Sequence, residues 1–299
     1  MMTSILTYTR IQWGIVFLML LVEFVWIKLS SFTFVYDQNI IIAYVISFSL
    51  IYLVYVWYQR FRPDPKILNL LQSTSLFLAF CPLMLGFSYL GAMVNQPLID
   101  ATLVSIDSHV GVHTPSVVFW FRNHKIFYLL FEAIYNTYLL QFPFIILYFG
   151  LSDENVSLQR YIMQFMIATP LTILISIFYP ATGPYTWYQY TPSPELLSAL
   201  KHLLDLRQHI LDITIPDGIV TMPSFHATMA CIDAYAFRRQ RKIIFIPILI
   251  LNILVVFSCI PIGQHYFADI LGGIAVFFVV IAIESFLFNY VNRKAPSSF

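Results

Sequence analysis

Two histidines and an aspartate have the side chains and the spacing that catalysis needs. His265 and Asp269 lie four residues apart, so on a helix their side chains share one face. A carboxylate beside an imidazole fixes the tautomer of the ring, holds its orientation and stabilises the imidazolium, which a nucleophilic or acid–base histidine requires. The same spacing is also typical of a structural hydrogen bond at a helix end, so the pair alone leaves both interpretations open.

The other histidine follows a stretch that is typical of a helix start. In Pro223-Ser224-Phe225-His226, the proline suits the first helical turn, because its missing N–H costs nothing there. The free backbone N–H groups of that turn, together with the Ser224 hydroxyl, predict a seat for a phosphate oxyanion with His226 beside it. A capping or packing role for His226 is the alternative.

Composition places these residues in a membrane protein. Of the 299 residues, 59% are hydrophobic and only 10% are charged, whereas a soluble domain carries roughly 25% charged residues. Too few charges remain to cover a water-facing surface, which excludes a soluble enzyme, a disordered chain and a basic protein that binds nucleic acid. The net charge of +1 provides no overall field for an acidic partner. We therefore expect an all-α polytopic membrane protein.

Eight apolar windows are long enough to cross the hydrocarbon, for which about 20 helical residues are needed. The sixth is the least apolar, because it contains His226 and Asp233. Residues 98–107 and the leucine-rich segment 196–211 are expected to form helices at the membrane surface, the second as a lid or as an ordinary connector. The eight windows cover residues 11–30, 39–58, 69–93, 126–149, 160–180, 220–237, 243–262 and 266–290.

Lysine and arginine positions indicate the orientation. With eight spans both termini lie on one side, and eleven of the sixteen cationic residues fall on that side. Because loops in the cytoplasm are enriched in these residues, the termini are predicted to be cytoplasmic. His226 and His265 then lie at the non-cytoplasmic face, where we expect the active site.

Together the two histidine motifs resemble the type-2 phosphatidic acid phosphatase superfamily of lipid phosphate phosphatases and haloperoxidases. Its motifs usually read K-x6-R-P, P-S-G-H and S-R-x5-H-x3-D, and Ser258 occupies the serine position of the third. The resemblance covers about residues 69–290 and implies a six-helix core. We therefore expect two domains, with two extra transmembrane helices in residues 1–68 and the core in residues 69–299.

Three departures from these motifs indicate a branch of the superfamily. Phe225 replaces the glycine of P-S-G-H, Cys259 replaces the arginine of the third motif, and no K-x6-R-P occurs near residues 179–184. That segment, YPATGP, is similar instead to a proline-rich element of the inositol phosphorylceramide synthases. Residues 265–269, HYFAD, match the H-Y-F-x-D that is typical of the same enzymes. The resemblance therefore implies an inositolphosphotransferase-like enzyme.

The resemblance also implies a role for each motif residue. His265 would attack phosphorus and form a phosphohistidine, Asp269 would orient its ring, and His226 would protonate the leaving oxygen and then activate the acceptor. The implied partners are a lipid phosphate or phospholipid donor and, for transfer, a lipid alcohol acceptor. No metal or cofactor is needed if fixed donors stabilise the phosphoryl oxygens.

The two arginines that usually neutralise the phosphate charge in this superfamily are missing. A charge-assisted hydrogen bond is worth about 1.5–3 kcal/mol, so other groups must replace them. Besides the N-terminus of the sixth span, the expected replacements are Ser224, Thr182, Gln264, Arg122 and Arg207.

Three other functions remain open. A lipid phosphate phosphatase would use the same residues with water as the acceptor. A transporter or scaffold would bury His226, His265 and Asp269 as a polar network or proton relay. A zinc site made from the same side chains is less favoured, because the H-E-x-x-H spacing of zinc enzymes is absent.

Overall fold

The computed structural model is an all-α polytopic membrane protein, which confirms the predicted fold class. It describes residues 2–152, 154–214 and 216–294. Across these residues the chain forms thirteen α-helices and two short strands. The helices are α1 (Met2–Leu29), α2 (Gln38–Phe61), α3 (Pro65–Ala92), α4 (Asp100–His109), α5 (Thr114–Asn123), α6 (Lys125–Asn136), α7 (Tyr138–Leu151), α8 (Asn155–Phe178), α9 (Pro184–Trp187), α10 (Pro194–Arg207), α11 (Phe225–Ala236), α12 (Lys242–Ser258) and α13 (Phe267–Lys294), and the strands are β1 (Thr33–Val35) and β2 (Ile210–Asp212).

Helices occupy all eight predicted windows, but not all are equally long. Among the described residues, α1, α2, α3, α8 and α13 are each long and apolar enough to cross a membrane. The pair α6 and α7, bent by 40° at its break, passes the same test together and adds a sixth span if the two helices cross as one. Helix α12 is apolar but has 17 residues, and α11 has only 12. Five to six spans are therefore supported, and the full count of eight stays a prediction.

Side chains and prolines at the N-termini explain where several helices begin. The carboxylate of Asp64 accepts the backbone N–H of Lys66 at 2.9 Å, and Pro65 occupies the first turn of α3. Ser193 and Pro194 start α10 in the same way. Both arrangements satisfy an N–H group that has no partner within the helix.

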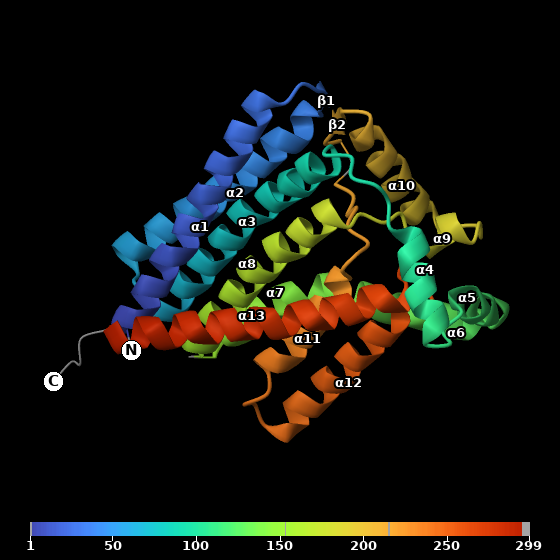
Figure 1. Cartoon of the computed structure of the whole chain (residues 1–299). Coiled ribbons are helices and arrows are strands. Elements are labelled where there is room, and N and C mark those ends of the chain that lie inside the picture. Colours follow the sequence, from blue (N-terminus) through green and yellow to red (C-terminus); the bar gives the residue numbers. More distant parts are fainter. Residues whose placement is uncertain (1, 153, 215, 295–299) are drawn as a thin grey trace.

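The centre of the bundle is built from α3, α8, α11 and α13 (Figure 1). Each contributes a side chain to the core that is at most 1% exposed, namely Phe80, Ile162, Ile232 and Val280. Helix α1 packs on α3, α8 and α13, whereas α2 contacts mainly α3 and has no buried residue. The division into residues 1–68 and a six-helix core stays a prediction.

The surface-helix predictions agree with the structure only in part. Helix α4 overlaps the expected segment 98–107, and α10 forms within 196–211. Leu211, which was expected on that helix, lies instead in β2, where it pairs in parallel with Phe34 of β1. The helix ends at Arg207 because His209 takes a positive φ of 63°, and the strand then finds its hydrogen-bond partners in the distant α1–α2 loop.

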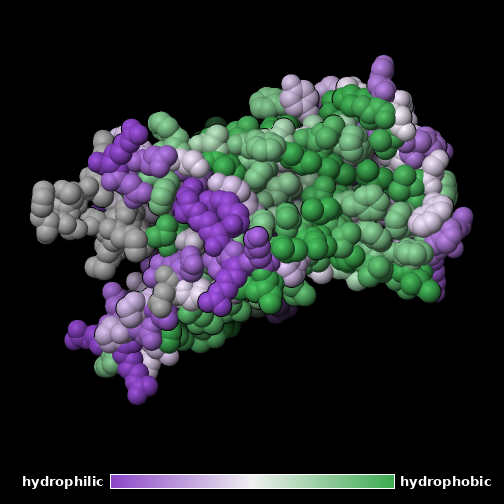
Figure 2. Space-filling model, turned by 90° about the horizontal axis from the view of Figure 1, so that it is seen from below, coloured by the Kyte–Doolittle hydropathy of each residue, from purple (hydrophilic) through white to green (hydrophobic). Residues whose placement is uncertain are grey.

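The surface is divided as a membrane protein requires. A broad hydrophobic face lies between hydrophilic regions at the two ends of the molecule (Figure 2). The first residues of α1 and the last residues of α13 lie at the same end, opposite to α4, α9 and α10 (Figure 1). This arrangement places the expected surface helices and the terminal cationic residues on opposite sides of the apolar face.

Candidate active site

The two histidine motifs meet where α11 begins beside the first turns of α13. The backbone N–H of Ser224 donates to the carbonyl of Asp269 at 2.9 Å, and the Thr228 hydroxyl donates to the carbonyl of Gly273 at 3.0 Å. A Cβ on Gly273 would lie 2.3 Å from the carbonyl oxygen of Ser224. Only glycine therefore allows the two backbones to approach this closely.

Asp269 lies in the first turn of α13, but His265 lies two residues before the helix begins, so the two residues do not share a helix as their spacing had suggested. Their side chains nevertheless face each other. His265 Nδ1 is 3.4 Å from Asp269 Oδ2, close enough for an ion pair when the ring is protonated. His265 is 3% exposed and Asp269 is fully buried. Oδ2 of Asp269 also accepts the backbone N–H of Tyr266 at 2.8 Å, so the carboxylate both faces the imidazole and fixes the turn that precedes α13.

His226 faces His265 across the cavity, with 6.0 Å between the two ring centroids. Two tyrosines flank its ring: Tyr135 stacks on it at a centroid distance of 4.2 Å, and Tyr138 lies at 4.6 Å. The Tyr135 hydroxyl contacts His226 Nδ1 at 2.9 Å and also donates to Gln264 Oε1. The sequence analysis missed both tyrosines, because a tyrosine in an apolar helix gives no sign of which distant side chain its ring or hydroxyl contacts.

Helix α4 holds the loop at residues 181–183 through one carboxylate. Asp100 accepts the backbone N–H groups of Thr182 and Gly183, at 3.1 and 3.0 Å, and the Tyr266 hydroxyl at 3.0 Å. Gly183 has a φ of 106°, which residues with a side chain rarely adopt. Burial raises the pKa of Tyr266, and the neighbouring Asp100 carboxylate raises it further. Thr182 is thereby fixed next to the histidine motif.

A second carboxylate of α4 caps α13. Asp107 accepts the backbone N–H groups of Phe267 and Ala268, each at 2.9 Å. Burial raises the pKa of Asp107, and the two N–H donors oppose that shift. Asp100 and Asp107 are seven residues apart, two turns on one helix face, and this spacing within an interfacial helix is the signal that could have found them.

A cavity of about 830 Å³ extends from the histidines into the bundle. Its polar end includes Thr182, His226, Gln264 and His265. Helix α10 covers one side with Leu196, Ala199, Leu200 and Leu203, as a lid would. The long apolar wall comes from α3, α7 and α8, through residues such as Phe77, Cys81, Met84, Leu85, Leu139, Phe142 and Phe165.

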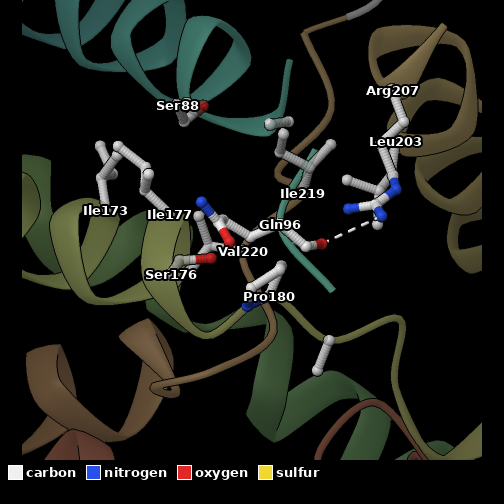
Figure 3. A pocket seen from close by; sticks show the side chains of 13 residues that line it. Ser88, Gln96, Ile173, Ser176, Ile177, Pro180, Leu203, Arg207, Ile219 and Val220 are labelled. Carbon is white, nitrogen blue, oxygen red and sulfur yellow. Dashed lines mark hydrogen bonds between the residues drawn. The ribbon is translucent and has the colours of Figure 1, made fainter. Parts of the chain in front are cut away.

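Three of the predicted phosphate-binding residues do not line this cavity. Ser224 is fully buried, and its hydroxyl caps α11 by accepting the N–H of Ala227 at 3.3 Å. Arg122 donates to the carbonyl of Thr191 at 2.6 Å. Arg207 donates to the carbonyl of Gln96 at 3.0 Å and lines a separate cavity of about 20 Å³, shown in Figure 3. Thr182 and Gln264 remain within the cavity.

No lysine or arginine lines the large cavity among the residues that the structure describes. In the same residues, no group of three or more His, Cys, Asp or Glu side chains is arranged to hold a metal ion. The histidines and the N-terminus of α11 are therefore the groups at its polar end that can carry positive charge or a positive dipole.

The arrangement is suited to phosphoryl transfer on a lipid. One imidazole is paired with a carboxylate, a second lies across from it, and a long apolar cavity leads to both. Comparison with protein families matches residues 101–283 to the PAP2 superfamily. Neither the curated proteins nor the solved structures contain a match. The matched segment holds both histidine motifs and one α4 carboxylate, Asp107, and the chain belongs to the PAP2 superfamily.

Proposed function

We propose that this protein is an integral-membrane phosphotransferase that moves a phosphate or phospho-headgroup between lipids through a phosphohistidine. Membership of the PAP2 superfamily supports lipid phosphatase or phosphotransferase chemistry. The observation that carries the proposal is the pair of histidines, 6.0 Å apart between ring centroids, at the polar end of an apolar cavity of about 830 Å³.

The proposed reaction has two steps. His265 Nε2 attacks the phosphorus of the donor, a P–N bond forms, and the bond from phosphorus to the lipid oxygen breaks while His226, which enters this step as the imidazolium, gives a proton to that oxygen and becomes neutral. His226 then takes the proton of the acceptor hydroxyl, whose oxygen attacks phosphorus and releases His265. Asp269, on the Nδ1 side of His265, stabilises the positive charge that the ring carries in the intermediate.

The scarcity of charge in the cavity favours a phosphodiester donor over a phosphomonoester. A diester carries one negative charge, whereas a monoester carries close to two at neutral pH, and moving charge into an apolar site without a partner is costly. Because no lysine or arginine lines the described cavity, the singly charged donor is easier to bind. Thr182, Gln264 and the N-terminus of α11 are the proposed donors to its oxygens.

Sequence motifs support the inositol phosphorylceramide synthase-like branch as the source of this activity. Phe225 and Cys259 occupy positions where phosphatases of the superfamily carry glycine and arginine, and residues 265–269 read HYFAD. The cationic residues support cytoplasmic termini and an active site on the opposite face. In this orientation α10 lies over the cavity at the non-cytoplasmic surface, where it can exclude water.

The choice of acceptor separates the proposal from a lipid phosphate phosphatase. Purified protein in lipid nanodiscs is given phosphatidylinositol or phosphatidic acid labelled in the phosphate, with and without ceramide or another long-chain alcohol. Transfer predicts a labelled lipid product that appears only with the alcohol. Free phosphate or inositol phosphate as the only labelled product, with or without the alcohol, would contradict the transferase and support the phosphatase.

Covalent trapping tests the two histidine roles. With His265 as the nucleophile, the His226→Ala variant still accumulates a labelled protein that survives alkali and is lost in acid, whereas His265→Ala does not. Label that is absent from both variants would leave the division of roles without support. A folded His265→Ala variant with full turnover would instead overturn the catalytic assignment of His265.

A further inference from the structure

Tyr135 of α6 is held between the acid–base histidine and the loop that carries the nucleophile. Its hydroxyl contacts His226 Nδ1 at 2.9 Å and donates to Oε1 of Gln264, the residue before His265. Tyr135 is only 5% exposed. Its hydroxyl therefore contacts both halves of the site from a third helix.

The directions of these hydrogen bonds determine where the proton of His226 lies. Oε1 of Gln264 can only accept, so the Tyr135 hydroxyl proton points to Gln264. The tyrosine oxygen can then only accept from His226, which must carry its proton on Nδ1. In a neutral imidazole with Nδ1–H, the lone pair lies on Nε2.

The break between α6 and α7 places this tyrosine. The two helices are bent by 40° relative to each other, with Thr137 between them. Tyr135 comes from the last turn of α6 and Tyr138 from the first turn of α7, and both rings contact His226. Only Tyr135 makes a hydrogen bond to the imidazole among the described contacts. Variants of the two tyrosines can therefore distinguish the effect of ring packing from the effect of the hydrogen bond.

We propose that Tyr135 is a positioning residue that keeps a proton on His226 Nδ1, so that Nε2 is the atom that gives a proton when the ring is the imidazolium and takes one when the ring is neutral. This inference rests on the acid–base role of His226 in the proposed function. When Nε2 is protonated the Nδ1–H bond to Tyr135 is kept, so the same contact serves the histidine before and after each proton transfer. Gln264 determines the direction of the two hydrogen bonds, because its Oε1 accepts the Tyr135 proton and leaves the tyrosine oxygen to accept from His226.

Removal of the hydroxyl separates this role from packing. Tyr135→Phe keeps the ring on His226 but frees Nδ1 and permits either tautomer. We expect kcat to fall about 10- to 100-fold with KM for phosphatidylinositol nearly unchanged, because general acid–base catalysis contributes about 10²–10⁴-fold. Tyr128→Phe removes a hydroxyl from the same helix two turns away, outside the cavity, and is the matched control with unchanged kcat.

The tautomer itself is read by nitrogen NMR of histidine-labelled protein in nanodiscs, with the His226 signal identified by its loss in His226→Ala. At a pH at which His226 is neutral, we expect Nδ1–H in the wild type and in Tyr138→Phe, and a mixture of tautomers in Tyr135→Phe. In Gln264→Leu the tyrosine proton has no acceptor on that side and turns to His226 Nδ1, so the predicted tautomer is Nε2–H.

Two outcomes would overturn the inference. One is an Nε2–H tautomer in the wild type, and the other is a Tyr135→Phe variant whose kcat and tautomer equal those of Tyr128→Phe. Failure of the proposed function looks different: the folded His226→Ala and His265→Ala variants would retain turnover. If those two variants lose turnover while Tyr135→Phe does not, only the role of Tyr135 is wrong.

Discussion

The two ends of the bundle each bury a carboxylate beside a cationic or basic side chain, but they satisfy it to different degrees. At the end near the termini, Glu284 of α13 receives two bonds from Arg160 of α8, at 2.8 and 2.7 Å. Tyr8 and Gln164 donate to the same carboxylate at 3.0 and 3.3 Å. This cluster joins α1, α8 and α13 and fills both oxygens of the glutamate.

At the other end, Asp269 and His265 retain polar atoms without a hydrogen bond. Both Oδ1 of Asp269 and Nδ1 of His265 are buried and lack such a partner among the described atoms, although Nδ1 lies 3.4 Å from Oδ2. Buried polar groups are nearly always satisfied, and exceptions call for an explanation. A carboxylate with hydrogen bonds to both oxygens, such as that of Glu284, stabilises one arrangement, whereas one with a free oxygen, such as that of Asp269, can gain interactions when substrate or positive charge arrives. We therefore assign stability to the first cluster and chemistry to the second.

Replacing His265 gives the largest effect that this assignment predicts. In His265→Ala we expect turnover of labelled phosphatidylinositol to fall by more than about 10⁴-fold, as is usual when a nucleophile is removed. The unfolding midpoint in detergent should change little, because the lost side chain has few saturated contacts. A variant that keeps more than a hundredth of the activity would remove the chemical role from this end.

Replacing Glu284 tests the opposite end. Glu284→Ala leaves Arg160 as a buried charge without its partner, and we expect a loss of about 3–5 kcal/mol in the free energy of unfolding. Activity per folded molecule should stay close to that of the wild type. Unfolding in denaturant measures the loss, and a double variant, Arg160→Met with Glu284→Met, should recover much of it. A large loss of activity per folded molecule in either variant, which the loss of stability does not explain, would contradict the division between the two ends.

Asp107→Asn should have a smaller effect, on both activity and stability. It weakens the acceptor that holds the N–H groups of Phe267 and Ala268, so we expect about 1 kcal/mol of stability and about tenfold in kcat to be lost. Asp64→Asn is its matched control, because Asp64 accepts two backbone N–H groups at the start of α3, far from the histidines. Equal activity in the two variants would show that the cap of α13 does not position the site.

Arg122→Gln and Arg207→Gln should give the smallest effects. Neither residue lines the large cavity, and each guanidinium is held by a backbone carbonyl. We expect KM for phosphatidylinositol to change by less than about threefold, because exposed charges usually contribute less than about 1 kcal/mol to an interaction. An increase above tenfold in either variant would mean that the cation reaches the phosphate, and the cavity would then not be as poor in charge as the structure indicates.

The sequence alone was enough for the fold class and the two histidine motifs. Apolar windows of about 20 residues identify membrane helices, because the length and polarity of a span are local properties of the chain. His265 and Asp269 were identified for a similar reason, since they are only four residues apart in one short motif, although His265 lies in the turn before α13 and not in the helix. The prediction that Leu211 belongs to the helix of residues 196–211 was wrong, because Leu211 lies in β2 and its strand partner lies in the α1–α2 loop.

Contacts between distant segments were decided only by the tertiary structure. Asp100 holds a loop about 80 residues away in sequence, Asp107 holds the start of α13 about 160 residues away, and Tyr135 reaches His226 across 91 residues. Arg122 and Arg207 lie outside the cavity for the same kind of reason, because each guanidinium is bound to a carbonyl that only folding brings near. Ser224 differs, because its hydroxyl is used locally to cap α11. A sequence motif determines which side chains can react, but the packing of α4, α6, α11 and α13 decides which atoms they face.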